Sequence, residues 1–285
     1  MRKLAREDPK SICLETCSLC NGNCVFCPYK SFHDDQVIYL EEKYILNVID
    51  EASGMSTERF SLFNNNEPLL DDRIFEYIKY VRKKMPHVRT TLSSNGKILT
   101  TDKLLCAILS GIDDFYISLP TLDPEMSIKL MGIDCEEIIE KILMLPKEFY
   151  RNVRLAVPLT RYFSKKDYAE RFDHLGIRYI TWEMEANSAW NEFDAIRELA
   201  DLKYNFGCDR PMDQAVISAN GDVLLCCRDW KHEAVTGNIK EKNLREIWRD
   251  DKMKKYQEFI GLGCYDKISV CRSCSRVCNL ERKSV

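Results

Sequence analysis

Cys20-Asn-Gly-Asn-Cys24-Val-Phe-Cys27 is the stretch from which the rest of this chain is best interpreted. Three thiolates within these eight residues can bind three corners of a cubic 4Fe–4S cluster, which leaves one iron without a protein ligand. Gly22 and the asparagines beside it tolerate unusual backbone angles, so the loop can curl around such a cube. An iron with an open position can bind a substrate or a cofactor, whereas a cluster that only carries electrons normally has four protein ligands.

A zinc site is the alternative for these cysteines. Zinc takes four tetrahedral nitrogen or sulfur ligands, usually from paired Cys-x-x-Cys spacings. Cys13 and Cys17 lie close enough in the sequence to supply a fourth ligand. The spacing by itself therefore leaves zinc open.

The composition is that of an ordinary soluble globular protein. The chain has 285 residues, of which 45% are hydrophobic and 31% charged, and it could form one large domain or a large and a small one. The net charge is −3 with both signs interspersed, which does not favour a nucleic-acid surface. No apolar run is long enough to cross a bilayer, and Met1 is not followed by a signal-peptide core. We expect a cytoplasmic protein that binds neither nucleic acid nor membrane.

In a reducing cytosol, fourteen cysteines indicate metal binding or redox chemistry rather than disulfides. The chain has only four histidines, so any metal ligands must be mostly cysteine sulfurs. Five of the cysteines lie within residues 13–27 and seven within residues 208–278. The two between them, Cys106 and Cys135, fall in apolar helical patterns and are expected to be buried. The distribution predicts two metal sites.

Short β-branched or aromatic runs alternate with amphipathic helical patterns from about residue 10 to residue 185. The expected strands are 11–16, 59–63, 90–94, 114–119, 153–159 and 178–184. The expected helices are 41–52, 72–84, 101–109, 124–143 and 165–175. This alternation predicts an α/β fold with a parallel sheet and helices outside it, either doubly wound or an incomplete barrel.

Polar residues gather where the expected strands end. Asn65-Asn66-Glu67-Pro68 follows the second strand, Ser94-Asn95-Gly96 the third, Ser118 the fourth, and Glu183 the sixth. Parallel α/β barrels place their active sites at this edge of the sheet. We therefore expect these residues to share one rim with the cysteine loop.

In this order, the motifs resemble those of the radical S-adenosylmethionine (SAM) superfamily. The three cysteines match its CxxxCxxC signature, and the stretches after the second and third strands resemble its GGEP and TNG motifs, although Asn65 and Asn66 replace both glycines of the former. The resemblance implies a partial (β/α)6 barrel of the TIM type. It also implies that SAM binds to the open iron of a 4Fe–4S cluster and is cleaved to a 5′-deoxyadenosyl radical.

The same resemblance implies roles for individual residues. Cys20, Cys24 and Cys27 would hold the cluster, and Phe26 would pack on the adenine of SAM. The remaining SAM contacts would come from the strand ends, namely Asn65, Asn66, Glu67, Ser94, Asn95 and Ser118.

The second cysteine group begins with a predicted β-hairpin. A Gly221-Asp222 turn joins residues 214–218 to residues 223–225, and this turn brings Cys208 and Cys226 towards the same end. Further along, Cys271-Arg-Ser-Cys274 places two thiols one turn apart. Zinc and an iron–sulfur cluster both suit these four thiols on spacing alone. Cys227 directly follows the expected ligand Cys226 and is expected to turn away from the metal site, because successive strand residues point to opposite faces.

This C-terminal part resembles the SPASM/twitch extension of radical SAM enzymes, including a helix that opens at Asn243. The resemblance implies a second 4Fe–4S cluster, held by Cys208, Cys226, Cys271 and Cys274. The form with two auxiliary clusters needs more cysteines in its C-terminal run, and the sequence ends soon after Cys278, so we expect the form with one auxiliary cluster. We predict a radical SAM domain at 1–195 and an auxiliary-cluster domain at 196–285.

The size and domain plan resemble the aminocyclitol dehydrogenases and sugar epimerases of antibiotic biosynthesis. The resemblance implies hydrogen abstraction from a C–H bond of a sugar-like small molecule or a peptide, with flavodoxin or ferredoxin as reductant. Dehydrogenation with the auxiliary cluster as electron acceptor, epimerisation with a cysteine hydrogen donor, and peptide modification are the possible outcomes. A metal-stabilised binding module is the non-enzymatic alternative.

Two features favour epimerisation among these outcomes. Ser188 lies where the dehydrogenase has an Arg that helps to deprotonate the substrate alcohol. Cys264 lies in a glycine-rich loop, from which a thiol can donate a hydrogen atom to a substrate radical. Cys278 is the alternative donor. Glu183, Glu185 and Trp190 are candidate substrate contacts.

Overall fold

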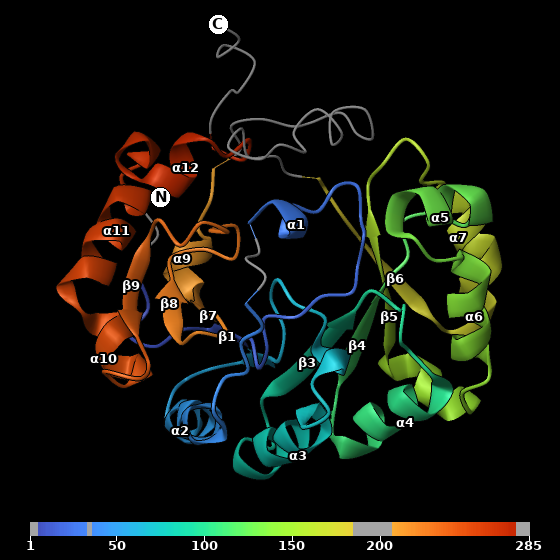
Figure 1. Cartoon of the computed structure of the whole chain (residues 1–285), viewed down its shortest axis with the longest axis horizontal. Helices are drawn as coiled ribbons and strands as arrows, with labels where there is room; N and C mark the ends of the chain where they lie inside the picture. The colour runs from blue at the N-terminus through green and yellow to red at the C-terminus, as the bar shows by residue number, and fades with distance from the viewer. Residues whose placement is uncertain (1–4, 33–35, 185–206, 278–285) are drawn as a thin grey trace, which may run out of the picture.

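Six parallel strands run side by side in chain order and form the greater part of one sheet (Figure 1). We describe the chain from a computed structural model, which covers residues 5–32, 36–184 and 207–277. Each strand pairs in parallel with the next one in the sequence. The strands are β1 (Ser11–Leu14), β2 (Arg59–Ser61), β3 (Arg89–Ser94), β4 (Asp114–Ser118), β5 (Val153–Pro158) and β6 (Arg178–Trp182).

Helices follow the strands and cover the outer side of this sheet (Figure 1). In α2 the buried residues Ile45, Val48 and Ile49 recur at helical spacing, so one stripe of the helix faces the core. The partial (β/α)6 barrel predicted from the sequence is confirmed. Its helices are α1 (Tyr29–Phe32), α2 (Glu42–Ser53), α3 (Ile74–Lys84), α4 (Thr101–Ser110), α5 (Pro124–Met131), α6 (Cys135–Leu143) and α7 (Lys165–Phe172), with short 3-10 turns η1 (Pro68–Leu70), η2 (Lys147–Asn152) and η3 (Asp173–Leu175).

The single helix expected over 124–143 is two helices, α5 and α6. Gly132 ends α5 in the left-handed conformation with φ +73°, where its N–H bonds the carbonyl of Ile128. Asp134 then caps α6 by accepting a hydrogen bond from the backbone N–H of Glu136. The expectation of one helix was wrong because the apolar periodicity continues through Gly132, whereas the backbone ends a helix at that residue.

The C-terminal segment adds three strands to the same sheet instead of forming a separate one. The predicted hairpin is present, with Gly221 at φ +94° in its turn. Its first strand, β7, pairs in parallel with β1, so the sheet order is β6-β5-β4-β3-β2-β1-β7-β8-β9. The new elements are β7 (Gln214–Ile217), β8 (Asp222–Leu224), β9 (Val235–Asn238), α9 (Arg210–Asp213), α10 (Leu244–Arg249), α11 (Asp251–Gly261), η4 (Tyr265–Lys267) and α12 (Ser269–Arg272).

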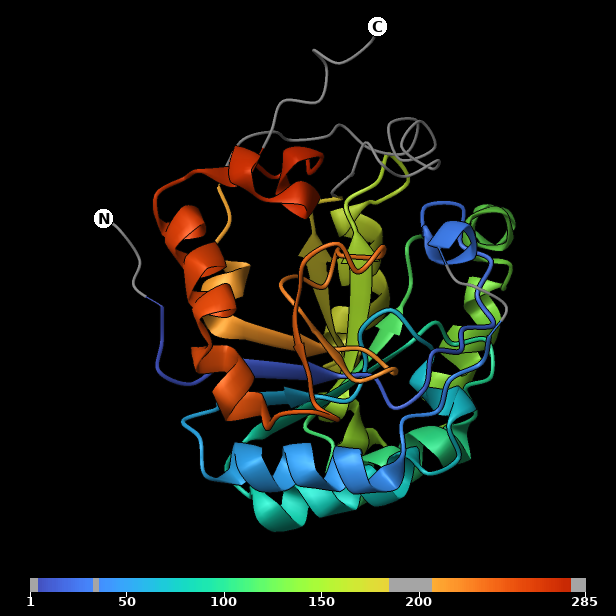
Figure 2. The ribbon, with the colours of Figure 1, turned by 60° about the vertical axis from the view of Figure 1, so that its left-hand side comes forward.

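This pairing covers the edge of β1 that an open barrel would leave exposed, and unpaired edges of this kind are a liability for a protein. In Figure 2 the strands β7 and β1 lie next to each other in the middle of the molecule, and the orange-red helices α10 and α11 lie at the left of the view. The predicted helix after Asn243 is present as α10, and the Asn243 side chain caps it. The predicted domain boundary at 195/196 lies outside the described residues and stays a prediction.

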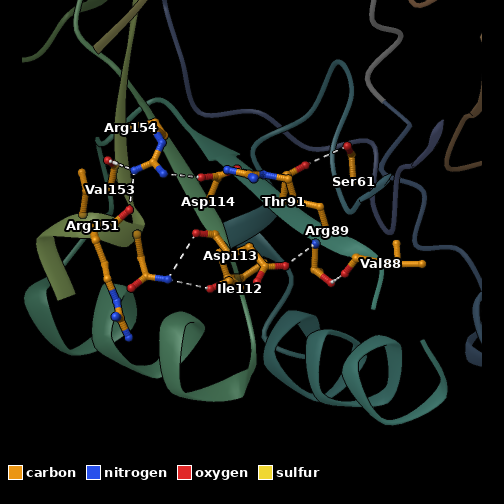
Figure 3. Close-up of polar contacts among 12 residues, drawn as sticks. Ser61, Val88, Arg89, Thr91, Ile112, Asp113, Asp114, Arg151, Val153 and Arg154 are labelled. Atoms are coloured by element: carbon orange, nitrogen blue, oxygen red, sulfur yellow. Dashed lines mark hydrogen bonds and ion pairs between the residues drawn. The ribbon is translucent and has the colours of Figure 1, made fainter. Parts of the chain in front are cut away.

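An ion-pair network around the buried Asp114 lies at the edge of the sheet where β3, β4 and β5 begin (Figure 3). Asp114, which is fully buried at the start of β4, pairs with the guanidinium of Arg154 at 2.8 Å and with Arg89. Next to it, Asp113 pairs with Arg82 at 2.5 Å and accepts the backbone N–H of Thr90 at 2.7 Å. These contacts link β3, β4 and β5 at the ends where the strands begin.

Candidate active site

The cysteine loop, residues 20–27, is closed by one tyrosine of α1. The backbone N–H of Cys20 donates to the hydroxyl oxygen of Tyr29 at 2.8 Å, and that hydroxyl donates to the carbonyl of Ser18 at 2.8 Å. In the middle of the loop, the N–H of Val25 donates to a carbonyl of α5 at 3.0 Å. The loop is therefore held to α1 and to α5 by hydrogen bonds that do not depend on a metal.

The thiols of this loop fit a cluster. The side chains of Cys20, Cys24 and Cys27 are each partly buried. The Cys20 sulfur accepts from the N–H of Gly22 at 3.3 Å and from Asn95 Nδ2 at 3.8 Å. A Cβ on Gly22 would lie 3.2 Å from the Cys20 sulfur and 3.7 Å from that of Cys24, so a side chain there would occupy the space of the thiols.

Burial raises the pKa of Cys20 to about 11 and that of Cys24 to about 12, and the nearby thiol of Cys27 adds to both shifts. Thiols with such pKa values are protonated at neutral pH, and a cationic metal cluster would displace their protons when it binds. The donor set, the glycine cradle and the closed loop are consistent with a site for a 4Fe–4S cluster.

Glu67 connects the loops that follow β1, β2 and β3. Its carboxylate accepts the backbone N–H of Asn95 at 2.7 Å and that of Leu69 at 3.2 Å, and its own N–H donates to the carbonyl of Leu19 at 2.7 Å. The side chain is buried, and this burial raises the pKa of Glu67 to about 7. Both carboxylate oxygens are thus engaged with the protein backbone, and a contact with SAM stays a prediction.

Asn65 and Asn66 replace the expected glycines, and both make contacts within the protein. The N–H of Asn65 donates to Glu15 Oε1 at 2.7 Å, and its Nδ2 donates to the carbonyl of Cys227 at 3.4 Å. Asn66 Nδ2 donates to the sulfur of buried Cys17 at 3.7 Å. The two asparagines therefore link the loop after β2 with β1 on one side and the C-terminal hairpin on the other.

The other predicted SAM contacts lie along the same rim. Asn95 Nδ2 donates to Asn21 Oδ1 at 2.9 Å, which joins the loop after β3 to the cysteine loop. Ser94 is buried and accepts the N–H of Gly96 at 3.1 Å, so its hydroxyl supports its own turn. Ser118 ends β4 and is partly exposed, and Phe26 is partly buried against the core.

A cavity of about 610 Å³ lies beside this rim, between α1 and the loops at the end of the C-terminal hairpin. Glu15, which directly follows β1, forms part of its lining although the residue is only 6% exposed. Its two carboxylate oxygens accept the N–H of Asn65 at 2.7 Å and the N–H of Ala219 at 3.2 Å. Burial raises the pKa of Glu15.

Glu15 therefore joins the loop after β2 to the C-terminal hairpin, a role that was not predicted from the sequence. An acidic residue directly after a buried strand was the only available signal, and it did not reveal that β7 would lie alongside.

The predicted auxiliary ligands lie at two places in the C-terminal part. The hydroxyl of Tyr265 in η4 accepts the N–H of Cys208 at 3.2 Å and lies 3.3 Å from its carbonyl, so Cys208 is fastened beside the element that precedes α12. Cys271 lies in α12, and the N–H of Cys274 donates to the Cys271 carbonyl at 3.2 Å. Cys226 follows β8, and its sulfur accepts the N–H of Arg228 at 3.4 Å.

Two expectations about other cysteines were wrong. Cys227 does not turn away from the expected ligand Cys226: the thiols of the two hydrogen-bond each other, because the chain leaves the regular strand after Leu224. Cys106 is exposed on α4, whereas Cys135 is fully buried as expected. The apolar pattern around Cys106 belongs to its neighbours, which turn the thiol outward.

Of the predicted catalytic residues and substrate contacts, the structure describes Glu183 and Cys264. Glu183 directly follows β6 and is partly exposed. Cys264 precedes η4 as a partly exposed free thiol, 4.0 Å from the carbonyl of Leu262. The other candidates named from the sequence, Glu185, Ser188, Trp190 and Cys278, lie outside the described residues.

Two further observations concern the described part of the chain. Within residues 5–32, 36–184 and 207–277, no three His, Cys, Asp or Glu side chains are arranged to hold a single metal ion. A 4Fe–4S cluster does not require such convergence, because each thiolate binds a different iron. None of the helices in these ranges combines the length and apolar character needed to cross a membrane.

Comparison with known sequences agrees with this arrangement. The sequence model of the radical SAM superfamily matches residues 14–162, from the end of β1 to just beyond β5. The chain belongs to the radical SAM superfamily. A second model, the SPASM iron–sulfur cluster-binding domain, matches residues 208–275. The cofactors of this radical SAM enzyme are accordingly SAM, a 4Fe–4S cluster and auxiliary iron–sulfur in the SPASM domain, in place of zinc.

Individual relatives match most of the length of the chain. The chain is 22% identical to the S-adenosyl-L-methionine-dependent 2-deoxy-scyllo-inosamine dehydrogenase of Niallia circulans, over 93% of this chain and 92% of that protein. It is 25% identical to the tungsten-containing aldehyde ferredoxin oxidoreductase cofactor-modifying protein of Pyrococcus furiosus, over 85% of this chain and 82% of the relative.

Solved structures show the same fold. The complex of BtrN with AdoMet and 2-DOIA superposes with a TM-score of 0.71 at 21% identity, covering 97% of this chain and 95% of BtrN. Streptococcus suis SuiB bound to S-adenosylmethionine superposes with a TM-score of 0.72 at 18% identity, covering 89% of this chain and 68% of SuiB.

Proposed function

We propose that Cys20, Cys24 and Cys27 hold the SAM-binding cluster of this enzyme. The support is the closed loop, in which the sulfurs of Cys20 and Cys24 lie close to Gly22. When bound, the cluster and SAM supply the radical that removes hydrogen from the substrate. The chain's own contribution is to position the strand-end loops around this site, through the hydroxyl of Tyr29 and the carboxylate of Glu67.

The remaining assignments extend this proposal along the rim. Phe26, Ser118 and the loops after β2 and β3, with Asn65, Asn66, Glu67, Ser94 and Asn95, surround the SAM molecule. Cys208, Cys226, Cys271 and Cys274 hold one auxiliary cluster. A flavodoxin or a ferredoxin supplies the electron for SAM cleavage.

For the reaction itself, dehydrogenation of a hydroxyl-bearing carbon in a small polar ring is the function that the geometry supports best. The observation that carries it is the cavity of about 610 Å³, which is of a size for a small molecule and is lined by both polar and aromatic side chains. A relative that matches this chain along nearly its whole length is named as a dehydrogenase of 2-deoxy-scyllo-inosamine, an amino-substituted cyclic alcohol.

Epimerisation, which the sequence favours, is the second candidate. It is supported by Cys264, a partly exposed free thiol in the loop after α11. In an epimerase this thiol would return a hydrogen atom to the face of the carbon opposite to the one that lost it. Glu183 would be a substrate contact in either reaction.

The deciding experiment uses the anaerobically reconstituted enzyme with 2-deoxy-scyllo-inosamine in D₂O. Dehydrogenation predicts a ketone product without deuterium at the reacting carbon and one SAM consumed per product. Epimerisation predicts a stereoisomer that carries one solvent deuterium. Absence of both products, with 5′-deoxyadenosine still formed, would reject this substrate class.

The matched variants are Cys264→Ala and Cys106→Ala, which remove one free thiol each. If the enzyme is a dehydrogenase, both variants retain ketone formation. If it is an epimerase, only Cys264→Ala loses the product, because Cys106 lies on the outer helix α4.

A further inference from the structure

The cavity beside the SAM motifs contains a histidine whose position is set by several surrounding groups. His232 lines this cavity from the loop between β8 and β9, together with Trp230 and Lys231. From the barrel side the lining includes Asn65 and the buried carboxylate of Glu15. Among the described residues, the lining includes none of the three cysteines of the first cluster loop, so the cavity adjoins the SAM motifs without coinciding with the cluster.

The imidazole of His232 is oriented by Asp222. Its Nδ1 lies 3.0 Å from Asp222 Oδ2, and within the described residues Nε2 makes no hydrogen bond. Asp222 is itself held by Asn220 Nδ2 at 2.8 Å and by Asn238 Nδ2 at 2.9 Å. When Nδ1–H donates to this carboxylate, Nε2 carries the free lone pair of the ring. Nε2 is then the atom that can accept a proton.

The backbone at His232 is strained. Its φ of +53° is the only positive φ of a non-glycine residue in the described part of the chain. The carboxylate of Asp229 maintains this turn by accepting the N–H groups of Glu233 at 2.9 Å and Ala234 at 2.8 Å. A left-handed conformation at a non-glycine residue costs energy and concentrates at functional positions.

The same loop also contacts α1. Lys231 Nζ lies 5.2 Å from the centre of the Phe32 ring at the end of α1, within cation–π range. The cavity is therefore lined by both aromatic rings and polar groups, the surroundings that bind a small ring with hydroxyl substituents.

We propose that this cavity binds the hydroxyl-bearing substrate and that His232, positioned by Asp222, accepts the proton of a substrate hydroxyl through Nε2. In this step the O–H bond breaks and an Nε2–H bond forms, while the electron pair stays on the substrate oxygen. No electrons leave the substrate in the transfer, and the imidazolium later releases its proton to solvent. The inference rests on the proposed function, because a dehydrogenase needs a base for the hydroxyl whose carbon it oxidises.

The charges around the ring determine the expected pH dependence. Asp222, Asp229 and Glu15 face His232 from three different segments, and the hydrogen bond to Asp222 is the largest cause of a raised His232 pKa. Asp229 belongs to the same loop as His232, and the other charged residues of this loop are Arg228, Lys231 and Glu233. Because Nε2 must be unprotonated to act, turnover should rise as the pH increases through this raised pKa.

The first test measures binding without turnover. Diethyl pyrocarbonate acylates unprotonated imidazole, and mass spectrometry of the His232 peptide reports the rate. Saturating 2-deoxy-scyllo-inosamine with the reconstituted enzyme and SAM, in the absence of reductant, is expected to slow labelling of His232 at least fivefold. Labelling of His174, an exposed histidine in η3, should not change.

The second test measures kinetics. His232→Gln is expected to lower kcat for ketone formation by about 10²-fold or more, the usual loss for a general base, whereas His174→Gln should not lower it. Asp222→Asn should lower kcat and also move the acidic limb of the pH profile to lower pH, because the His232 pKa loses its main support. A merely structural role of Asp222 would leave the limb in place.

The outcomes separate the two levels of the proposal. Turnover of the aminocyclitol with no protection of His232, or with full kcat in His232→Gln, overturns the inference and leaves the dehydrogenase function standing. Protection of His232 without turnover supports the cavity as the ligand site and rejects the proposed reaction. If the enzyme shows neither protection of His232 nor turnover, both the inference and the proposed function are rejected.

Discussion

Removing the buried charge of Asp114 is expected to destabilise the protein severely. Asp114 is fully buried, its partner Arg154 is 7% exposed in its side chain, and the two are 2.8 Å apart. Burial lowers the pKa of the Arg154 guanidinium, and the Asp114 carboxylate opposes this shift. In Asp114→Asn the cation remains buried without its anion. Losing one partner of a buried pair costs about 3–5 kcal/mol in free energy of unfolding.

The assay is urea unfolding of the anaerobic protein, followed by circular dichroism. Arg89, the second partner of Asp114, is half exposed and can be solvated, so the loss should come mainly from Arg154. The double variant Asp114→Asn/Arg154→Met removes the unpaired cation and is expected to be more stable than Asp114→Asn alone. Iron content per folded chain should not change, because the cysteine loop lies at the opposite edge of the sheet.

The matched control is Glu76→Gln, which breaks an exposed pair with Lys79 at 2.7 Å on the outer helix α3. An exposed pair of this kind contributes about 0–1 kcal/mol. A loss below about 1 kcal/mol in Asp114→Asn, or a double variant less stable than the single one, would refute the reasoning about the buried charge.

Two further changes test the supports of the active-site edge. The folded pKa of Glu67 is raised from 4.5 to about 7, so the unfolded state gains from ionisation as the pH rises between these values and the wild type loses about 3 kcal/mol of stability. Glu67→Gln lacks this term, and unfolding curves at pH 5 and pH 8 should show the difference; a wild-type-to-variant gap that is constant with pH would contradict it. In Gly96→Ala a Cβ would lie 2.9 Å from Ile138 Cδ1 at φ +81°, whereas in Gly176→Ala, at φ +71°, it meets open space. Thermal unfolding should therefore show a larger loss for Gly96→Ala, by about 1–3 kcal/mol, and equal losses would mean that Ile138 moves aside.

Much of the fold was predictable because local patterns decide it. Each of the six barrel strands was located to within a few residues, since apolar β-branched runs followed by polar turns have few other solutions. The C-terminal hairpin and the helix after Asn243 were predictable for the same reason. The break at Gly132 was not, because a glycine within an apolar periodicity either continues a helix or ends it according to what packs around it.

The candidate site was predictable only in part. The sequence located Glu67 and Asn95 at neighbouring strand ends, and the structure joins them by a hydrogen bond of 2.7 Å. It assigned no role to Glu15 or His232. Their positions depend on the pairing of β7 with β1, which joins segments about two hundred residues apart and leaves no periodic trace in either.

The spacing of Cys20, Cys24 and Cys27 and the order of motifs behind it determined by themselves that this is a radical SAM enzyme. The three thiols of this loop lie within eight consecutive residues, so the sequence itself shows that they can bind one cluster. The cavity was decided only by the tertiary structure. Its walls come from the barrel and from the C-terminal hairpin, which become neighbours when β7 covers the open edge of β1. The side chains that would select a substrate are brought together by that long-range pairing, and no local pattern encodes it.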